Sequence, residues 1–396
     1  MTKEYSPFTP GVPVPIEFFV GRSQELNQIV ASAKRTLENK SIERLFIFGE
    51  RGIGKSSLSR FASRVAERDL RLLSLHVFLG GVSSLEEMVR RIFERLLQQN
   101  AEKPWFESIR RFLGNHVKHV GLFGLSLEFD ASQKDLSRAV SDFAPALRNL
   151  LKELEQNWKG FFLILDDLND LAANPVFANW LKSLVDEIAT GDEPLPLTLV
   201  LIGLPMRRHQ LIANQPSLDR VFDLIEIKRF HKQETMEFYR QAFGKMNLQV
   251  TQKAYNILWK FSGGFPVFMH EIGDAVFKID KDNQIDEHDA IAGVLNAANI
   301  IGGKYIEPKV LQAIRSEKYK VILKKVTKKP FENQFSRRAV IHGLSEVEAK
   351  VFDNFLQRMK KLDVIRSDRE RGAGFYEFTS ELYYLFLWMH ASAQER

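Results

Sequence analysis

The chain has 396 residues, of which 44% are hydrophobic and 27% charged, with a formal net charge of +6 and no cysteine. This composition is typical of a globular protein with two or three hydrophobic cores, and it excludes a disulfide framework and a thiolate metal site. No apolar run approaches the length of a membrane span, so we expect no membrane partner. The nine histidines show no metal-ligand spacing, and we expect no zinc.

The N-terminal residues 1–17 contain Pro10, Pro13 and Pro15, which predict an extended lead-in. From residue 18 to about 230, apolar strands alternate with amphipathic helices, which predicts an α/β domain built on a parallel sheet. Within this domain, residues 104–145 are predicted to be an insertion, with a basic helix followed by a hairpin. The sequence does not indicate what this insertion does.

Residues 45–57, LFIFGERGIGKSS, match the phosphate-binding pattern G-x-x-x-x-G-K-[ST] after a strand and before a helix. The glycines let successive backbone N–H groups point at anionic oxygens, and the helix directs its positive end at the same place. Lys55 is expected to reach the β- and γ-phosphates, and Ser56 to bind Mg²⁺. An incidental glycine-rich turn is the alternative. The predicted nucleotide-binding residues of this loop are Gly49, Glu50, Arg51, Gly52, Ile53, Gly54, Lys55, Ser56 and Ser57.

Residues 161–170, FFLILDDLND, are predicted to form a buried strand that ends in two acids. Asp166 is expected to hold Mg²⁺ through water, and Asp167 lies where many ATPases keep a glutamate that polarises the attacking water. Since an aspartate is one methylene shorter than a glutamate, hydrolysis is expected to be slow. Paired acids at a strand end can also mark a turn, but the upstream phosphate-binding loop favours a site.

The order of these motifs resembles that of the AAA+/STAND class of P-loop ATPases, above all the archaeal-type ATPases with a C-terminal winged helix. These are relatives of the archaeal origin-recognition ATPases. Residues 18–22, FFVGR, followed by Glu25 and Leu26, are similar to the F-V-G-R-x-x-E-L box of that class. The resemblance implies that Phe19 and Val20 contact adenine; ordinary core packing is the alternative. Use of ATP and Mg²⁺ without an export signal implies the cytoplasm.

Two further segments extend the resemblance. The strand predicted at 197–203 follows as the sensor-one strand would, but it ends in Gly203 without the polar sensor residue usual there. Residues 217–222, SLDRVF, are similar to the segment that carries the arginine finger in oligomeric relatives. The resemblance implies self-assembly in which Arg220 stabilises phosphoryl charge on a neighbouring subunit. A surface arginine is the alternative.

Residues 231–303 are predicted to form a helical lid. Within it, residues 262–266, SGGFP, are similar to the G-x-P element of STAND-type lids, which implies that Pro266 packs near adenine. The arginine that follows this element in origin-recognition proteins is absent. His270 could replace it in part, but a core histidine is the more common alternative.

Residues 304–396 hold the whole positive excess of the chain, with 19 Lys and Arg against 12 Asp and Glu, whereas the other 303 residues hold 37 against 38. Helices are predicted at 308–326, near 335–341 and at 345–361. A two-stranded wing with its tip at 367–372 is predicted to follow. Three helices and a glycine-tipped hairpin resemble a winged helix.

The winged helix implies one of two functions. In the first, nucleotide state controls the binding of double-stranded DNA, with the helix at 345–361 in the major groove and the wing on the backbone or minor groove. The DNA-binding residues then expected in the wing are Arg366, Arg369 and Arg371. In the second, the protein is a STAND-type signalling switch whose winged helix is a latch for a protein partner. Salt-dependent duplex binding separates the two.

Overall fold

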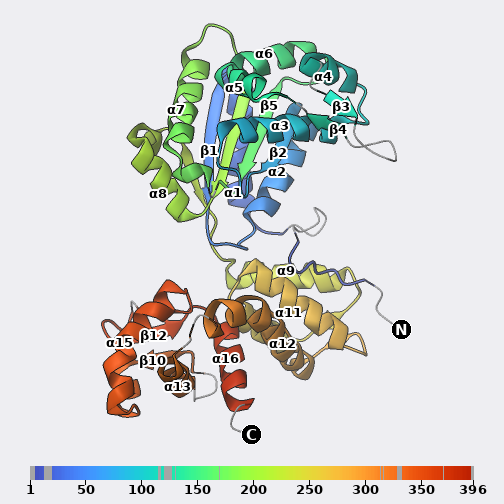
Figure 1. Ribbon diagram of the computed structural model, residues 1–396. Coiled ribbons are helices and arrows are strands. Elements are labelled where there is room, and N and C mark those ends of the chain that lie inside the picture. Colours follow the sequence, from blue (N-terminus) through green and yellow to red (C-terminus); the bar gives the residue numbers. More distant parts are fainter. Residues whose placement is uncertain are drawn as a thin grey trace. The chain divides into compact units, whose positions relative to one another are not determined.

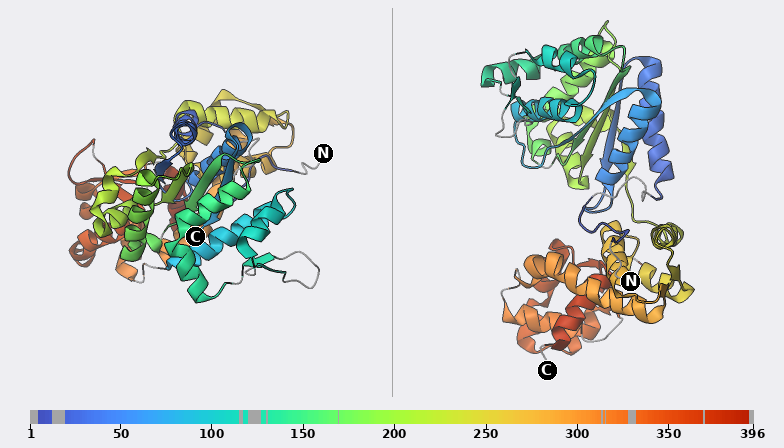
Figure 2. Two further views of the ribbon diagram at one scale, coloured as in Figure 1. Left: turned by 90° about the horizontal axis from the view of Figure 1, so that it is seen from above. Right: turned by 90° about the vertical axis from the view of Figure 1, so that its right-hand side faces the viewer.

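The structure is a computed structural model that describes residues 5–12, 20–114, 117–119, 127–129, 131–168, 170–312, 314, 316–327, 332–368 and 370–393. It divides into two compact units, which we call the sheet unit (Arg22–Lys228) and the helical unit (Met1–Gly21 with Arg229–Arg396) (Figures 1 and 2). Within the described residues, no helix is both long enough and apolar enough to cross a membrane.

In the described part of the sheet unit, five parallel strands lie in the order β2-β5-β6-β1-β7. The strands are β1 (Ile42–Phe48), β2 (Leu72–Phe78), β5 (Gly160–Asp166), β6 (Leu197–Gly203) and β7 (Asp223–Glu226). The predicted α/β fold with a parallel sheet is therefore confirmed. Because parallel strands share one carboxyl edge, the turn after β1 and the acids at the end of β5 lie at the same edge.

Helices cover both faces of this sheet, α1 and α2 on one face and α3 to α7 on the other (Figure 2, right). Between α4 and α5, β3 (Val117–His119) pairs antiparallel with β4 (Leu127–Phe129), as expected for the predicted hairpin. The helices of this unit are α1 (Ser23–Asn39), α2 (Lys55–Leu70), α3 (Leu85–Asn100), α4 (Phe106–Leu113), α5 (Gln133–Ser141), α6 (Phe143–Glu153), α7 (Pro175–Thr190) and α8 (Pro205–Asn214), with short 3₁₀ segments η3 (Leu171–Ala173) and η4 (Pro216–Arg220).

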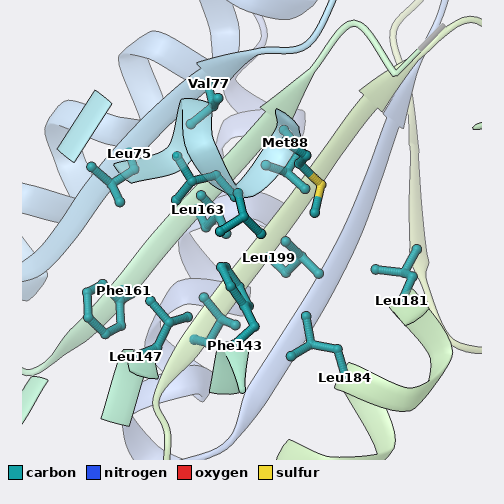
Figure 3. Packing of buried hydrophobic residues seen from close by; sticks show 14 of the residues in the cluster. Leu75, Val77, Met88, Phe143, Leu147, Phe161, Leu163, Leu181, Leu184 and Leu199 are labelled. Atoms are coloured by element: carbon teal, nitrogen blue, oxygen red, sulfur yellow. The ribbon is translucent and has the colours of Figure 1, made fainter. Parts of the chain in front are cut away.

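The strands are buried on both faces, which explains their nearly continuous apolar sequences. Leu75, Leu163 and Leu199 lie on one face, where they belong to a cluster with Met88 of α3 and Phe143 of α6 (Figure 3). Strand residues of the opposite parity are also buried, on the face that α1 and α2 contact. This double burial fixes the carboxyl edge of the sheet, where the candidate site lies.

The described residues from 232 to 301 form the first part of the helical unit. They comprise α9 (Lys232–Gly244), α10 (Gln252–Ser262), α11 (Pro266–Ile279) and α12 (Glu287–Ile301), with a short parallel pair, β8 (Gln249–Val250) and β9 (Gln284–Ile285). The N-terminal segment packs against these helices: Phe8 is 3% exposed, and its ring centroid lies 4.9 Å from that of Phe243. A Cβ on Gly273 would lie 2.4 Å from the Phe8 ring. The lead-in is therefore anchored by a buried side chain.

The C-terminal part of the helical unit contains a three-stranded antiparallel sheet in the order β10-β12-β11. Its elements are the π-helix η5 (Gly302–Leu311), α13 (Glu317–Val326), β10 (Gln334–Ser336), α14 (Arg337–His342), α15 (Glu346–Lys361), β11 (Ile365–Ser367), β12 (Phe375–Phe378) and α16 (Glu381–Ala393). The two strands of the predicted wing, β11 and β12, pair as expected.

Two predictions for this part were wrong in extent. The helix predicted at 308–326 is two elements, because the π-helix ends at Leu311 and α13 begins only at Glu317. The first residues of the helix predicted near 335–341 belong to strand β10 instead, and helix α14 begins only at Arg337. There the Ser336 side chain accepts from the backbone N–H of Ala339 and caps α14, so the preceding residues remain extended and pair with β12.

Candidate functional site

The turn between β1 and α2 has the geometry of an anion-binding loop. Gly52 and Gly54 take left-handed backbone conformations, with φ of 83° and 96°. A Cβ on Gly49 would lie 2.6 Å from the Ile227 carbonyl oxygen, so only glycine fits there without a shift. No side chain caps the N-terminus of α2, which begins at Lys55. The first N–H groups of α2 therefore lack an intrahelical partner and can face an anion.

Lys55 supplies the positive charge of this loop. Its Nζ donates to the carbonyl oxygens of Gly49, at 3.0 Å, and Glu50, at 2.8 Å. Burial lowers the pKa of Lys55, while the carboxylates of Asp166 and Asp167 act in the opposite direction. The amine thus lies within electrostatic reach of both acids at the end of β5. Its contact with the β- and γ-phosphates stays a prediction.

The other predicted loop residues differ in exposure. Glu50 and Arg51 are exposed, Ile53 is buried, and Ser56 and Ser57 are half-buried at the start of α2. The predicted loop residues therefore include two whose side chains face solvent and one, Ile53, whose side chain anchors the loop in the core.

Arg22 is a contact to this loop that the sequence analysis did not assign. Its side chain is 6% exposed, and its Nη2 donates to the Ile53 carbonyl at 3.4 Å while Nη1 donates to Glu25 at 3.3 Å. Arg22 thereby supports the backbone of the phosphate-binding turn. Val20, two residues earlier, is half-buried, and Phe19 lies outside the described residues. Their contact with adenine stays a prediction.

The two acids at the end of β5 have different surroundings. Asp166 is the last residue of the strand and is 4% exposed, with its Oδ2 2.9 Å from Nε2 of His76. Asp167 is exposed and has a left-handed backbone, with φ of 63°. A Cβ on Gly80 would lie 2.8 Å from Oδ2 of Asp167, so this carboxylate lies close to the turn after β2.

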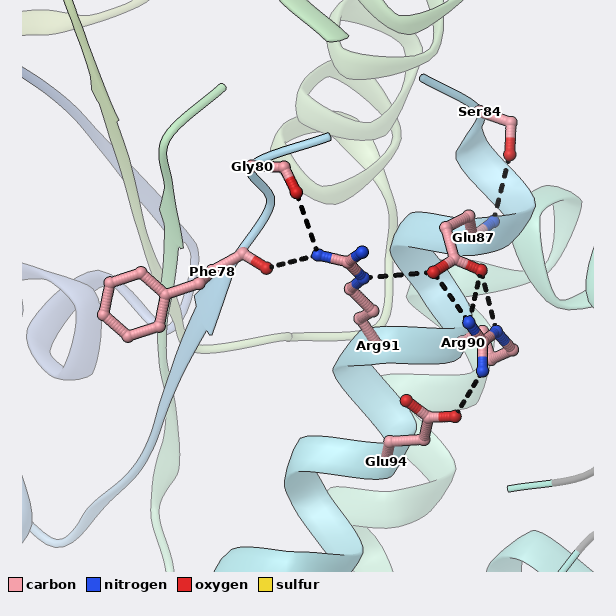
Figure 4. A network of polar contacts seen from close by, with 7 residues as sticks. All are labelled: Phe78, Gly80, Ser84, Glu87, Arg90, Arg91 and Glu94. Atoms are coloured by element: carbon pink, nitrogen blue, oxygen red, sulfur yellow. Dashed lines mark hydrogen bonds and ion pairs between the residues drawn. The ribbon is translucent and has the colours of Figure 1, made fainter. Parts of the chain in front are cut away.

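The turn after β2 is fixed from α3 (Figure 4). Arg91 donates to the carbonyl oxygens of Phe78, at 3.1 Å, and Gly80, at 3.3 Å. Glu87 accepts from Arg91 at 3.0 Å and also accepts from Arg90. This network holds in place the backbone that lies beside Asp167. The sequence could have predicted the Glu87–Arg91 pair, because the two residues lie four apart on one helix.

These residues fit a nucleotide with Mg²⁺. The uncapped start of α2 and the Lys55 amine match the charge of phosphates. Mg²⁺ prefers oxygen ligands and keeps several waters, and the Ser56 hydroxyl and the Asp166 carboxylate offer such oxygens. Ser56 and Asp166 are the residues that would hold the ion.

The predicted sensor and finger segments lie in the same unit. Strand β6 ends at Gly203 and is followed by α8, so no polar side chain stands at its last position. Arg220 ends η4 and is exposed, and no described residue forms an ion pair or hydrogen bond with it. The neighbouring Asp219 pairs instead with Arg208. Arg220 is thus open to solvent, and its role stays a prediction.

In the helical unit, Pro266 is the first residue of α11 and is half-buried. The preceding Gly264 has φ of 68°, and a Cβ there would lie 2.0 Å from the Phe230 carbonyl oxygen. His270 is a core histidine: it is 5% exposed, and its Nδ1 accepts from the backbone N–H of Thr9 at 3.1 Å. Burial lowers the pKa of His270 to about 4, so it is neutral near pH 7 and does not supply a sensor cation.

Two of the predicted DNA-binding arginines of the wing lie beside local acids. Arg366 pairs with Glu377 at 2.6 Å, and Arg371 lies 3.8 Å from Asp368. Arg369 lies outside the described residues. The Arg366–Glu377 pair arises because the two residues are register partners of β11 and β12, which the sequence alone does not reveal.

Helix α15 carries cations that, unlike Arg366 and Arg371, do not pair with a described acid. Lys350, Arg358 and Lys361, which we call the α15 cations, are exposed, and no described residue forms an ion pair with them. Asn354 and Gln357 are exposed on the same helix. Arg, Lys, Asn and Gln are the residue types that read base edges in a DNA major groove.

Comparison with known proteins gives a match to one domain model over part of the chain and a similar fold. Residues 19–201 match the family model described as "AAA ATPase domain". No curated protein matches the chain. Among solved structures, the chain is similar to a Walker-type ATPase of Pyrococcus abyssi, with a TM-score of 0.55, 17% identity, and coverage of 93% of this chain and 96% of that one. It is also similar to the ORC2 protein of Aeropyrum pernix in ADPNP–ADP complexes, with a TM-score of 0.56, 12% identity, and coverage of 99% and 97%.

Proposed function

We propose that the protein binds adenine nucleotide with Mg²⁺ and hydrolyses ATP slowly, because residues 19–201 match the model of the AAA ATPase domain. The observation that carries the proposal is the loop from Gly49 to Gly54, which closes on the Lys55 amine and leads into the uncapped start of α2. The similar ORC2 protein was solved in ADPNP–ADP complexes, which supports adenine as the base.

The roles of the side chains follow from their positions. Lys55 neutralises the β- and γ-phosphates, and the N-terminal N–H groups of α2 hold their oxygens. Ser56 and Asp166 are the residues that would hold Mg²⁺, which would polarise the phosphates. Asp167 orients the attacking water. Its carboxylate is exposed and is on a shorter side chain than a glutamate, so it restricts the water less, and turnover is slow.

The C-terminal part, we further propose, is a winged helix that binds double-stranded DNA, with α15 as the helix that enters the major groove. The observation that favours it is the set of exposed α15 cations, none of which pairs with a described acid. Glu348 and Asp353, two acids of the same helix, are neutralised by Lys325 and Arg337. Arg366 and Arg371 of the wing contribute less, because they must first exchange their carboxylate partners for phosphate.

A second candidate function is a STAND-type signalling switch whose winged helix is a latch for a protein partner. Its support is the packing of the C-terminal part on α10 to α12. Arg229 donates to the carbonyl of Thr379 at 3.2 Å, and the Phe268 ring centroid lies 5.5 Å from that of Tyr383. A Cβ on Gly302 would lie 2.0 Å from the Phe386 ring. In this reading, the partner is a protein and not DNA.

One experiment separates these functions. A fluorescently labelled duplex is titrated with the protein in the apo, ADP and ATP states over a series of salt concentrations. Duplex affinity that changes with nucleotide and falls linearly with the logarithm of salt supports the DNA function. Nucleotide binding without duplex binding, even at low salt, favours the protein latch. Failure to bind either nucleotide contradicts the whole proposal.

A further inference from the structure

A histidine that neither the motifs nor the proposed reaction use lies beside the metal-binding acid. His76 lies in the carboxyl half of β2, and its side chain is 10% exposed, while that of Asp166 is 6% exposed. The two belong to neighbouring parallel strands, and His76 Nε2 lies 2.9 Å from Asp166 Oδ2. The pair therefore links the carboxyl half of β2 to the carboxyl end of β5.

A histidine is costly at this position unless its polar atoms have partners. Strand β2 reads LLSLHVF and is otherwise apolar apart from one serine, and a buried polar group without a hydrogen bond costs free energy. The imidazole also stacks on Phe78, with ring centroids 4.6 Å apart and an interplanar angle of 23°. Stacking and hydrogen bond together fix the ring in one orientation toward Asp166.

The consequence for Asp166 is that its two oxygens are not equivalent. Oδ2 is occupied by the histidine, whereas no described residue donates a hydrogen bond to Oδ1. A carboxylate held in this way cannot rotate freely about its terminal bond. Groups that bind a metal ligand from behind in this way orient it, and their loss typically costs about 10- to 100-fold in metal affinity.

We propose that His76 is a positioning residue for Mg²⁺: it donates from Nε2 to Oδ2 of Asp166 and so directs Oδ1 toward the ion and its waters. This inference rests on the proposed nucleotide function. The role does not depend on the charge of the ring, because Nε2 carries a hydrogen both in the imidazolium and in the neutral tautomer that the carboxylate selects. A merely structural histidine would instead stabilise the sheet without affecting Mg²⁺.

The test compares two substitutions at His76 by equilibrium binding of a fluorescent ADP analogue. His76→Phe keeps an aromatic ring for stacking and removes the donor, whereas His76→Gln keeps an N–H at a similar distance. Each protein is titrated with Mg²⁺ at fixed nucleotide and measured separately in EDTA. We expect His76→Phe to raise, about 10-fold or more, the Mg²⁺ concentration at which the tightening of ADP-analogue binding is half-maximal. The affinity for the ADP analogue in EDTA should be unchanged. His76→Gln should stay within about threefold of the parent protein.

Thermal unfolding without ligand checks that each variant folds, and His76→Leu replaces His76→Phe if the latter does not. In the Asp166→Asn background, removing the His76 donor should have no further effect on Mg²⁺ dependence, since the two residues act as one unit. Superimposable Mg²⁺ titrations for folded His76→Phe and the parent would overturn the inference, as would an equal loss in His76→Gln. If Mg²⁺ did not change the affinity of the parent protein for the ADP analogue, or if the parent did not bind the analogue at all, the proposed function itself would be overturned.

Discussion

Lowering the pH from 7 to 5 should destabilise the helical unit, because the unfolded chain protonates His270 in this range while the folded protein, in which the pKa of His270 is lower, resists protonation. In the folded protein this ring is buried beside Phe8 and Phe238, with centroids 6.2 and 5.0 Å away, and its Nδ1 accepts from the Thr9 N–H. A proton on Nδ1 abolishes that hydrogen bond and places a charge among apolar side chains. Asp274 is the described charge that acts in the opposite direction, and burial outweighs it.

The magnitude follows from the pKa. Burial lowers the pKa of His270 from 6.5 to about 4, so the unfolded chain takes up this proton at a higher pH than the folded protein does. The contribution of the neutral histidine to stability is complete above the unfolded pKa and is lost as the pH falls from there toward the folded pKa. At about 1.4 kcal/mol per pKa unit, the loss is about 2 kcal/mol at pH 5 and about 3 kcal/mol well below pH 4.

Urea unfolding of the parent and of His270→Gln at pH 7 and pH 5 measures this loss. The glutamine oxygen can accept from the Thr9 N–H and does not titrate, so the variant controls for every other group in the protein. Between the two pH values the parent should lose about 2 kcal/mol more than the variant. Amide hydrogen exchange at Thr9 should accelerate at pH 5, relative to its intrinsic rate, only in the parent. Equal pH dependence of the two proteins would refute the reasoning.

Three further outcomes are expected. Gly49→Ala should weaken nucleotide binding about tenfold or more, because its Cβ would lie 2.6 Å from the Ile227 carbonyl and would displace the loop; unchanged affinity in calorimetry would contradict this. Asp167→Asn should lower the ATP turnover rate about 100-fold while leaving nucleotide affinity nearly intact, and a parental rate in a phosphate-release assay would remove Asp167 from the mechanism. Neutralising the α15 cations together should weaken duplex binding and reduce its logarithmic salt slope by up to about 3. Neutralising Arg366 and Arg371 should cause a smaller change in both. Equal affinity and slope in both variants and the parent would exclude both surfaces as DNA-binding sites.

The features that the sequence predicts correctly here are local in the chain. The phosphate-binding turn needs glycine at a few positions between a strand and a helix, and Gly52 and Gly54 have the left-handed conformations that this requires. The apolar run of β5 predicted a strand covered on both faces of a parallel sheet, because such a strand has no polar face. Asp166 and Asp167 lie at the same edge of the sheet as the phosphate-binding turn, because parallel strands share one carboxyl edge.

The features that the sequence did not reveal depend on which residues become neighbours after folding. His76 meets Asp166 only because β2 pairs with β5 in one register, and Arg366 meets Glu377 only because β11 pairs with β12 in one register. A shift of one residue would separate either pair. The docking of Phe8 against Gly273 joins segments far apart in the chain, and no local pattern in a proline-rich lead-in predicts it.

The central claim is that the loop around Lys55 binds the phosphates of an adenine nucleotide, and calorimetry of ADP and ATP with Mg²⁺ tests it most directly. The parent is compared with Lys55→Ala and with Lys34→Ala, which removes the same charge from an exposed position of α1. Lys55→Ala should weaken binding about 10- to 100-fold, since charge-assisted hydrogen bonds contribute about 1.5–3 kcal/mol, whereas Lys34→Ala should match the parent. Equal affinity of all three proteins for ATP, or no binding by the parent, would contradict the claim.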